Sequence, residues 1–203
     1  MAQVTREVQL RHDVAAAQRV SGMLAGLIVR WRRQLAAVHH AAHPGEWTMY
    51  DSVDVREIPP GAQAVAGYID GRFANWEELT LRFPHAHRLS IAVDPLDDAD
   101  CLDVESGDAT VGQAVPWLLR QLNQDAHRPC VYGSRSTMSQ IVPRLRAAGI
   151  RRSEIRLWVA DPTGHPHIPA GFDACQWWWG ALGRDLDQSA CLPTFFTTPL
   201  AKR

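Results

Sequence analysis

The stretch Cys101-Leu-Asp-Val-Glu-Ser-Gly-Asp108 sets two carboxylates two residues apart in an apolar segment. On a β-strand, side chains at i and i+2 share a face, so Asp103 and Glu105 are predicted to point the same way. Leu102 and Val104 are expected to pack on the opposite face, against covering helices. Burial and mutual repulsion would raise at least one of the two carboxyl pKa values, as a general acid at neutral pH requires. The alternative is a surface acidic strand end or a structural ion pair.

Working outward from this stretch, the chain alternates strand-like and helix-like segments. Helices are predicted over 76–83, 110–124 and 136–148, and no helix is predicted between the last three strands. Eight strands alternating with helices predict a parallel sheet that closes into a barrel lacking its final helices. A Rossmann-type sheet is the competitor, but no Gly-x-Gly-x-x-Gly follows the first strand. The predicted strands are 49–53, 64–70, 88–94, 101–106, 129–134, 154–161, 173–179 and 184–189.

The N-terminal part has a different pattern. Apolar residues recur at alternating four- and three-residue spacing over 10–38, which predicts a long amphipathic helix. Such a heptad pattern is typical of a coiled coil or of a helix docked on a partner, and packing on its own domain is an equal alternative. His39, His40 and His43 near its end are interpreted as solvated rather than metal-binding. We therefore predict a helix and linker over 1–45 and a barrel domain over 46–203.

Composition narrows the classes of function. The 203 residues are 46% hydrophobic and 21% charged with a formal net charge of −1, which gives no reason to expect nucleic acid or an anionic membrane as partner. The longest early apolar run, 22–29, is too short for a membrane span, and no signal peptide is recognised. The four cysteines form no C-x-x-C pair, so buried free thiols are favoured, with a disulfide left open. No metal or cofactor is predicted.

Acidic and aromatic side chains recur toward the C-terminal ends of the predicted strands. In a parallel barrel these ends converge on one mouth, where carboxylates and aromatic faces together are typical of a carbohydrate site. Closure would also make Asp51 and Asp185 neighbours. The residues that the pattern selects are Asp51, Asp70, Asp94, Asp103, Glu105, Tyr132, Trp158, Asp161, Gln176, Trp177, Asp185 and Asp187.

Seven motifs come in an order and spacing that resemble the glycoside hydrolase family 25 lysozymes and their actinobacterial and phage relatives of the DUF1906 glycoside-hydrolase-like type. The resemblance covers roughly residues 50–195 and implies a TIM-like (β/α)5(β)3 barrel, here preceded by the long helix. It also implies cleavage of the β-1,4 bond between N-acetylmuramic acid and N-acetylglucosamine in peptidoglycan. The motifs are Tyr50-Asp-Ser52, Gly67-Tyr-Ile-Asp70, Leu102-Asp-Val-Glu105, Val131-Tyr-Gly-Ser134, Leu157-Trp-Val-Ala160, Cys175-Gln-Trp177 and Asp185-Leu-Asp187.

The resemblance also assigns roles. Glu105 corresponds to the general acid/base, and Asp103 to the partner that orients the substrate's N-acetyl group. Asp51 and either Asp185 or Asp187 correspond to acids that shape the sugar site. Tyr132, Trp158 and Trp177 correspond to sugar-contacting or pocket-lining aromatics, and Asp70 and Gln176 complete the predicted substrate-binding set.

Two functions follow as hypotheses. The first is a peptidoglycan-cleaving muramidase of phage or prophage origin, made in the bacterial cytoplasm and acting at the cell wall in lysis or as part of a virion. The second is a non-catalytic structural or glycan-binding module, for example in a phage tail, which is favoured by Tyr50 and Asp161-Pro-Thr standing where the family has other residues. A glycosidase for another polysaccharide is a weaker third. The N-terminal helix would mediate self-association or docking to a larger assembly.

Overall fold

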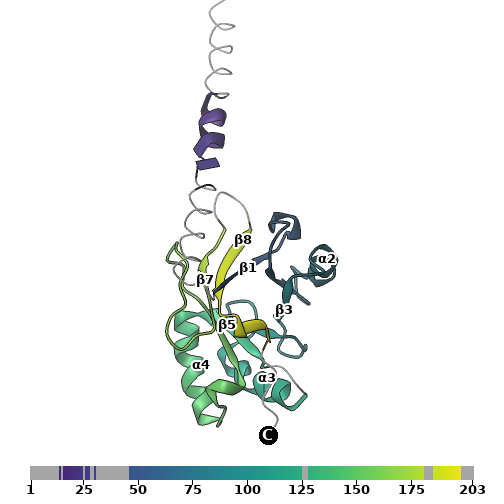
Figure 1. The fold of residues 1–203 in the computed structure, drawn as a ribbon. Helices are drawn as coiled ribbons and strands as arrows, with labels where there is room; N and C mark the ends of the chain where they lie inside the picture. The colour runs from purple at the N-terminus through teal and green to yellow at the C-terminus, as the bar shows by residue number, and fades with distance from the viewer. Residues whose placement is uncertain are drawn as a thin grey trace, which may run out of the picture. The chain divides into compact units, whose positions relative to one another are not determined.

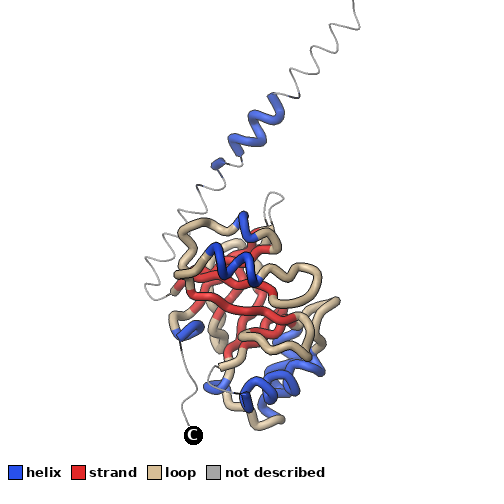
Figure 2. The backbone as a smooth tube through the Cα atoms, turned by 90° about the vertical axis from the view of Figure 1, so that its right-hand side faces the viewer, coloured by secondary structure: helices blue, strands red, loops and turns tan. Residues whose placement is uncertain are grey.

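A computed structural model describes residues 14, 16–24, 26, 27, 30, 46–124, 128–180 and 185–197. The chain divides into two units, Met1–Ala42 and His43–Arg203. In the second unit, the strands lie at the centre and the helices at the periphery (Figure 2). The strands are β1 (Trp47–Ser52), β2 (Ala64–Tyr68), β3 (His87–Ala92), β4 (Cys101–Asp103), β5 (Cys130–Ser134), β6 (Arg156–Ala160), β7 (Ala174–Trp178) and β8 (Leu186–Cys191).

The eight strands form a closed barrel in chain order. Each pair from β1 to β7 is parallel, whereas β8 runs antiparallel to both β7 and β1, and these three strands lie side by side (Figure 1). The barrel is therefore mixed. Around it lie α2 (Trp76–Arg82), α3 (Val111–Gln124), α4 (Arg135–Ala147), α5 (Thr194–Thr197) and the short 3-10 turns η1 (Val55–Glu57) and η2 (Arg152–Glu154).

The predicted TIM-like (β/α)5(β)3 barrel is wrong, although the predicted strand segments are found. The connection from β1 to β2 holds only the turn η1, and the turn-rich connection from β3 to β4 holds no helix. Seven residues, 179–185, join β7 to β8. Across this short connection β8 returns antiparallel to β7, as strands joined without a crossover helix can do.

The predicted long N-terminal helix and coiled coil are also wrong. The described helical residues of this unit are 14, 16–24, 26, 27 and 30, and they form no long helix. Val20, Met23 and Leu24 are 56%, 70% and 54% exposed, so the apolar stripe packs on nothing in the described part of the chain. Most of a helix's stability in a protein comes from packing of such a stripe, which explains why periodicity alone misled. His39, His40, His43 and the linker 41–45 lie outside the described residues.

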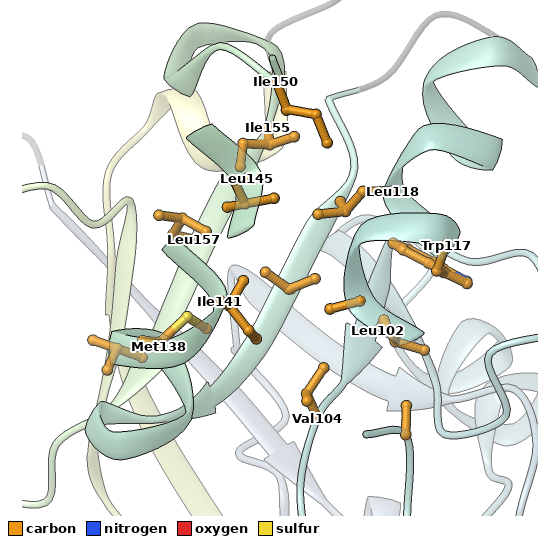
Figure 3. Packing of buried hydrophobic residues seen from close by; sticks show 14 of the residues in the cluster. Leu102, Val104, Trp117, Leu118, Met138, Ile141, Leu145, Ile150, Ile155 and Leu157 are labelled. Carbon is orange, nitrogen blue, oxygen red and sulfur yellow. The ribbon is translucent and has the colours of Figure 1, made fainter. Parts of the chain in front are cut away.

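The outer layer of the barrel confirms the predicted orientation of Leu102 and Val104. Both are buried in an apolar cluster between the sheet and the helices α3 and α4, which also holds Trp117 and Ile141 (Figure 3). A second cluster fills the barrel interior and combines large aromatic side chains, such as Trp158 and Tyr132, with smaller ones. It includes Met49, which precedes Asp51 by two residues on β1. The alternation along β1 and β4 thus directs Asp51 and Asp103 inward.

Two smaller predictions can be compared with the described residues. Cys101, Cys130, Cys175 and Cys191 are buried free thiols, as expected. In the described part of the chain, no helix combines the length and apolar character needed to cross a bilayer.

Candidate functional site

Four carboxylates, here called the acid cluster, meet at the end of the barrel where the parallel strands finish: Asp51, Asp103, Glu105 and Asp187. Asp51 is on β1, Asp103 ends β4, and Glu105 follows two residues later. Because β8 is antiparallel, its second residue, Asp187, lies at this same end and is the register partner of Asp51. Three strands distant in sequence therefore direct acids toward one mouth.

Asp51 and Asp103 are the buried members of the acid cluster. Asp51 is 5% exposed and Asp103 3% exposed, and one carboxyl oxygen of each, Oδ2 and Oδ1 respectively, is buried without a hydrogen-bond partner. Burial, followed by the charges of Asp187, Asp103 and Glu105, raises the pKa of Asp51 well above its usual value. Burial, with Glu105 and Asp108, raises the pKa of Asp103 to about 8. Asp103 is therefore mainly protonated at neutral pH, and the pKa of Asp51 is shifted in the same direction.

Glu105 and Asp187 are more accessible. Glu105 is exposed at the rim, and its pKa is raised by desolvation, Asp108 and Asp187, with the nearby Tyr132 hydroxyl acting in the opposite direction. The pKa of Asp187 is raised by burial, while hydrogen bonds from Gly180 and Gln176 oppose the rise. The cluster thus combines buried acids whose pKa is raised with a carboxyl that can reach a ligand.

A hydrogen-bonded chain crosses the mouth from β5 to β8. The Tyr132 hydroxyl donates to Oε1 of Gln176, and Nε2 of Gln176 donates to Oδ2 of Asp187 at 2.6 Å. The backbone N–H of Gly180 donates to the other oxygen of Asp187 at 2.9 Å. Tyr132 is also the register partner of Asp103. This chain sets the amide orientation of Gln176 and holds Asp187 in place.

A cavity of about 260 Å³ opens beside the acid cluster. Trp179 at its edge is 56% exposed, which leaves an indole face free beside the acids. The lining residues are Asp51, Ser52, Val53, Tyr68, Trp179, Gly180, Asp185 and Asp187. A larger cavity of about 540 Å³ lies at the opposite end, where β1 to β3 begin, and no carboxylate lines it.

The structure brings most predicted site residues together. Asp51, Asp103, Glu105, Tyr132, Gln176 and Asp187 belong to the acid cluster or its hydrogen-bonded chain. The sequence left open whether Asp185 or Asp187 belongs to the site. The structure makes Asp187 the register partner of Asp51, while Asp185 is exposed and lines the same cavity.

Three residues of the predicted substrate-binding set lie elsewhere. Asp70 accepts hydrogen bonds from the backbone N–H groups of Val93 and Asp94, both at 2.8 Å, and so holds the loop after β3. Trp158 is 2% exposed inside the barrel, where its ring packs on Tyr132 with centroids 4.5 Å apart. Trp177 points outward into the cluster beneath the helices. None of the three lines the cavity.

The two aromatic residues of the cavity, Tyr68 and Trp179, were missed by sequence reasoning. Tyr68 follows Ala64 and Ala66 at intervals of two on β2, so the strand period itself could have identified it. Its hydroxyl pKa is raised well above the usual value by burial and by the carboxylates, Asp51 first. Trp179 gave no comparable signal, because the third residue of a Trp-Trp-Trp run has no preferred face once the strand has ended at Trp178.

The comparisons with known proteins support a fold and no family. No family model matches the chain. No curated protein matches it either. A crystal structure at 1.07 Å of an uncharacterized B. stearothermophilus protein is similar, with a TM-score of 0.52 and 12% sequence identity, over 73% of this chain and 97% of that one. At this identity the similarity concerns the fold alone, so the resemblance to family 25 lysozymes gains no support from it.

Proposed function

We propose that this protein is a glycosidase of the muramidase type that acts on peptidoglycan or a related glycan through the acid cluster. The observation that carries the proposal is the pairing of an accessible Glu105, whose pKa is raised, with a buried Asp103 at one mouth. A carboxyl with a raised pKa beside a second carboxyl is what glycosidic bond cleavage uses. The choice of peptidoglycan and of a phage or prophage setting rests on the sequence resemblance.

In the proposed reaction, Glu105 donates a proton to the leaving glycosidic oxygen. Its exposed position at the rim gives it access to a bound sugar, and its raised pKa favours the protonated form required for this step. As the glycosidic oxygen leaves, the carbonyl oxygen of the substrate's N-acetyl group, which Asp103 orients from deeper in the mouth, bonds to the anomeric carbon. Water, giving its proton to the Glu105 carboxylate, then breaks this bond and restores the protonated Glu105. Trp179 offers a face for stacking on a sugar ring.

A second function, a non-catalytic glycan-binding module, is favoured by the size of the cavity. Its volume of about 260 Å³ is below the roughly 300–1,000 Å³ of typical ligand pockets. That space suits one sugar ring better than the two rings that flank a cleaved bond. Under this function Trp179 and Asp187 would bind a sugar without turnover.

The test is the release of reducing ends from purified peptidoglycan. We expect the wild-type protein to release them and Glu105→Gln to lose the activity at least a hundredfold. Glu78→Gln, which changes an exposed carboxyl on α2 outside the cavity, is the matched control and should keep full activity. Absence of release by the wild type above the Glu105→Gln background would overturn the glycosidase. Retention on insoluble peptidoglycan that is lost in Trp179→Ala would then support the binding module.

The N-terminal part belongs to the same proposal. We infer that residues 1–45 attach the protein to a second copy or to a larger assembly at the cell wall or in a virion. The exposed apolar side chains of Val20, Met23 and Leu24 support this role. Mass measurement in solution of the full chain and of a chain lacking residues 1–43 tests self-association. If each protein has the mass of its own monomer, self-association is excluded.

A further inference from the structure

A cluster of metal-ligating side chains lies on the outside of the barrel, apart from the acid cluster. Asp161 directly follows β6, His167 is in the connection to β7, and Cys175 is on β7. Because Gln176 points inward, its neighbour Cys175 points outward, where it joins the outer apolar cluster. One ligand atom from each of Asp161, His167 and Cys175 lies within 4.8 Å of the other two.

The individual distances place the His167 ring between the other two groups. Nε2 of His167 is 2.8 Å from Oδ2 of Asp161 and 3.7 Å from Sγ of Cys175. Around a tetrahedral zinc ion, with bonds of about 2.0–2.3 Å, ligand atoms lie roughly 3.3–3.8 Å apart. The nitrogen–sulfur separation already fits, and the nitrogen–oxygen pair needs to open by about half an ångström.

The second ring nitrogen of His167 has the support that a metal ligand requires. Nδ1 lies 3.1 Å from the His165 carbonyl oxygen. With the proton on Nδ1 donated to that carbonyl, the lone pair of Nε2 faces both Asp161 and Cys175. A backbone carbonyl that fixes the tautomer in this way is the usual outer partner of a zinc-bound histidine.

We propose that Asp161, His167 and Cys175 form a binding site for a divalent transition-metal ion, zinc in particular. The ligand set of one thiolate, one imidazole and one carboxylate matches zinc, and magnesium or calcium would prefer oxygen ligands alone. Binding replaces the thiol proton of Cys175, which passes to solvent. The side chains of Asp161 and His167 are 17% and 26% exposed, so solvent reaches the site and a water molecule supplies the fourth ligand.

The ion would fasten the β6–β7 connection to the barrel wall. This connection, 161–173, contains no helix, and its described backbone hydrogen bonds to β7 are those of Asp161 and Gly164 near its start. It carries Pro162, Pro166 and Pro169, which restrict its backbone and reduce the entropy lost on binding. Ligands six and eight residues apart match no common zinc motif, which is why the sequence predicted no metal.

Arg135 competes with the metal. Its guanidinium is 2.5 Å from Oδ2 of Asp161, and its side chain is 59% exposed. An exposed ion pair of this kind is weak, about 0–1 kcal/mol, so zinc can displace the guanidinium. Arg135→Gln should therefore tighten zinc binding by up to about fivefold. A merely structural ion-pair network would not predict this gain.

The experiment uses the full chain, stripped with a chelator and titrated with Zn²⁺ against a chromophoric competitor and with Co²⁺ in the spectrophotometer. We expect the wild-type chain to bind one more zinc ion than the His167→Gln chain. Because the other histidines are the same in both proteins, any zinc that they bind does not affect this difference. We also expect a sulfur-to-cobalt charge-transfer band, which is absent in Cys175→Ser. His165→Gln changes a neighbouring ring outside the ligand set and is the matched control, with affinity unchanged within twofold.

His167 is partly exposed, so the His167→Gln variant should fold. It therefore tests the site even if the Cys175→Ser variant does not fold. Equal zinc binding by the wild type and His167→Gln, or no cobalt–sulfur band in the wild type, would overturn the site and leave a hydrogen-bonded Asp161–His167 pair. Glu105→Gln should bind zinc as the wild type does, so this result is independent of the proposed glycosidase.

Discussion

Asp51 and Asp187 are register partners across the antiparallel junction of β1 and β8, where the barrel closes. Two carboxyls in such a position cannot both be ionised cheaply, and burial and the charge of Asp187 raise the pKa of Asp51 well above its usual value. Nearby, Gln176 and the Gly180 N–H donate to Asp187 and oppose the rise of its pKa. The closure of the barrel thus places two identical groups in different environments, one without a partner for its buried oxygen and one hydrogen-bonded at both oxygens.

The first prediction concerns the pH dependence of stability. In the unfolded chain Asp51 titrates near pH 3.9, while in the folded protein its pKa is raised, so the folded state binds more protons above about pH 4. The free energy of unfolding should therefore fall as pH rises from about 4 toward neutrality. Asp51→Asn should remove part of this fall and be more stable than the wild type at pH 7 by about 1–3 kcal/mol. Urea denaturation at pH 5 and pH 7 measures both effects.

Asp98→Asn is the control for that experiment. Asp98 is an exposed carboxyl whose pKa is lowered by Gln121 and Arg120, so its removal should not stabilise the protein at pH 7. Equal behaviour of Asp51→Asn and Asp98→Asn across the pH range would contradict the raised pKa of Asp51.

The second prediction concerns Gln176, which connects Tyr132 to Asp187. Gln176→Leu has similar size but leaves the Tyr132 hydroxyl and Asp187 without their partner at the mouth. Stranding buried polar groups costs roughly 1–3 kcal/mol each, so the free energy of unfolding should fall by about that amount. Gln140→Leu, on the exposed face of α4, should change stability by less than about 0.5 kcal/mol. Similar unfolding midpoints for the two variants would show that the hydrogen bonds from Tyr132 through Gln176 to Asp187 contribute little to stability.

The third prediction concerns the close approach of β5 to α4. A Cβ atom at Gly133 would lie 2.8 Å from Cγ2 of Thr137 and 3.0 Å from the backbone oxygen of Val104. A backbone oxygen cannot move aside, so Gly133→Ala should destabilise the protein by about 1–3 kcal/mol. Gly112→Ala in α3 meets nothing closer than 3.9 Å and should instead stabilise by about 0.5–1 kcal/mol. Thermal unfolding of both variants is the measurement, and a Gly133→Ala protein as stable as the wild type would contradict the packing.

Local patterns predicted much of the mouth, and long-range pairing explains the rest. Period-two alternation correctly directs Asp103 inward and Leu102 outward, because that rule depends only on the strand itself. The same rule makes Gln176 and Trp177 face opposite sides, so both could not line one site. The direction of β8 is seen only in its antiparallel pairing with β7 and β1, and the choice between Asp185 and Asp187 depends on the register with β1. Neither is visible in the motif itself.

The N-terminal unit shows the limit of periodicity. A heptad pattern reports which side chains could share a face, and it does not report whether a surface exists to cover them. In the described residues Met23 remains 70% exposed, and Gly22 and Gly26 each lower the local helix propensity by about 1 kcal/mol relative to alanine. The apolar stripe alone therefore does not predict a long helix.

The last prediction concerns Trp179, the exposed aromatic at the edge of the mouth cavity. Its side chain is 56% exposed and lines the cavity beside Asp187 and Gly180, so it contributes little to the buried core. Trp179→Ala should leave the unfolding midpoint nearly unchanged but weaken glycan binding at least fivefold, because stacking on a sugar face supplies about 1 kcal/mol or more. Binding is measured by isothermal titration with soluble peptidoglycan fragments. Leu81→Ala, which removes an 83% exposed apolar side chain on α2, controls for the loss of surface area alone. Equal binding by the two variants would remove Trp179 from the site and leave the acids without an aromatic platform.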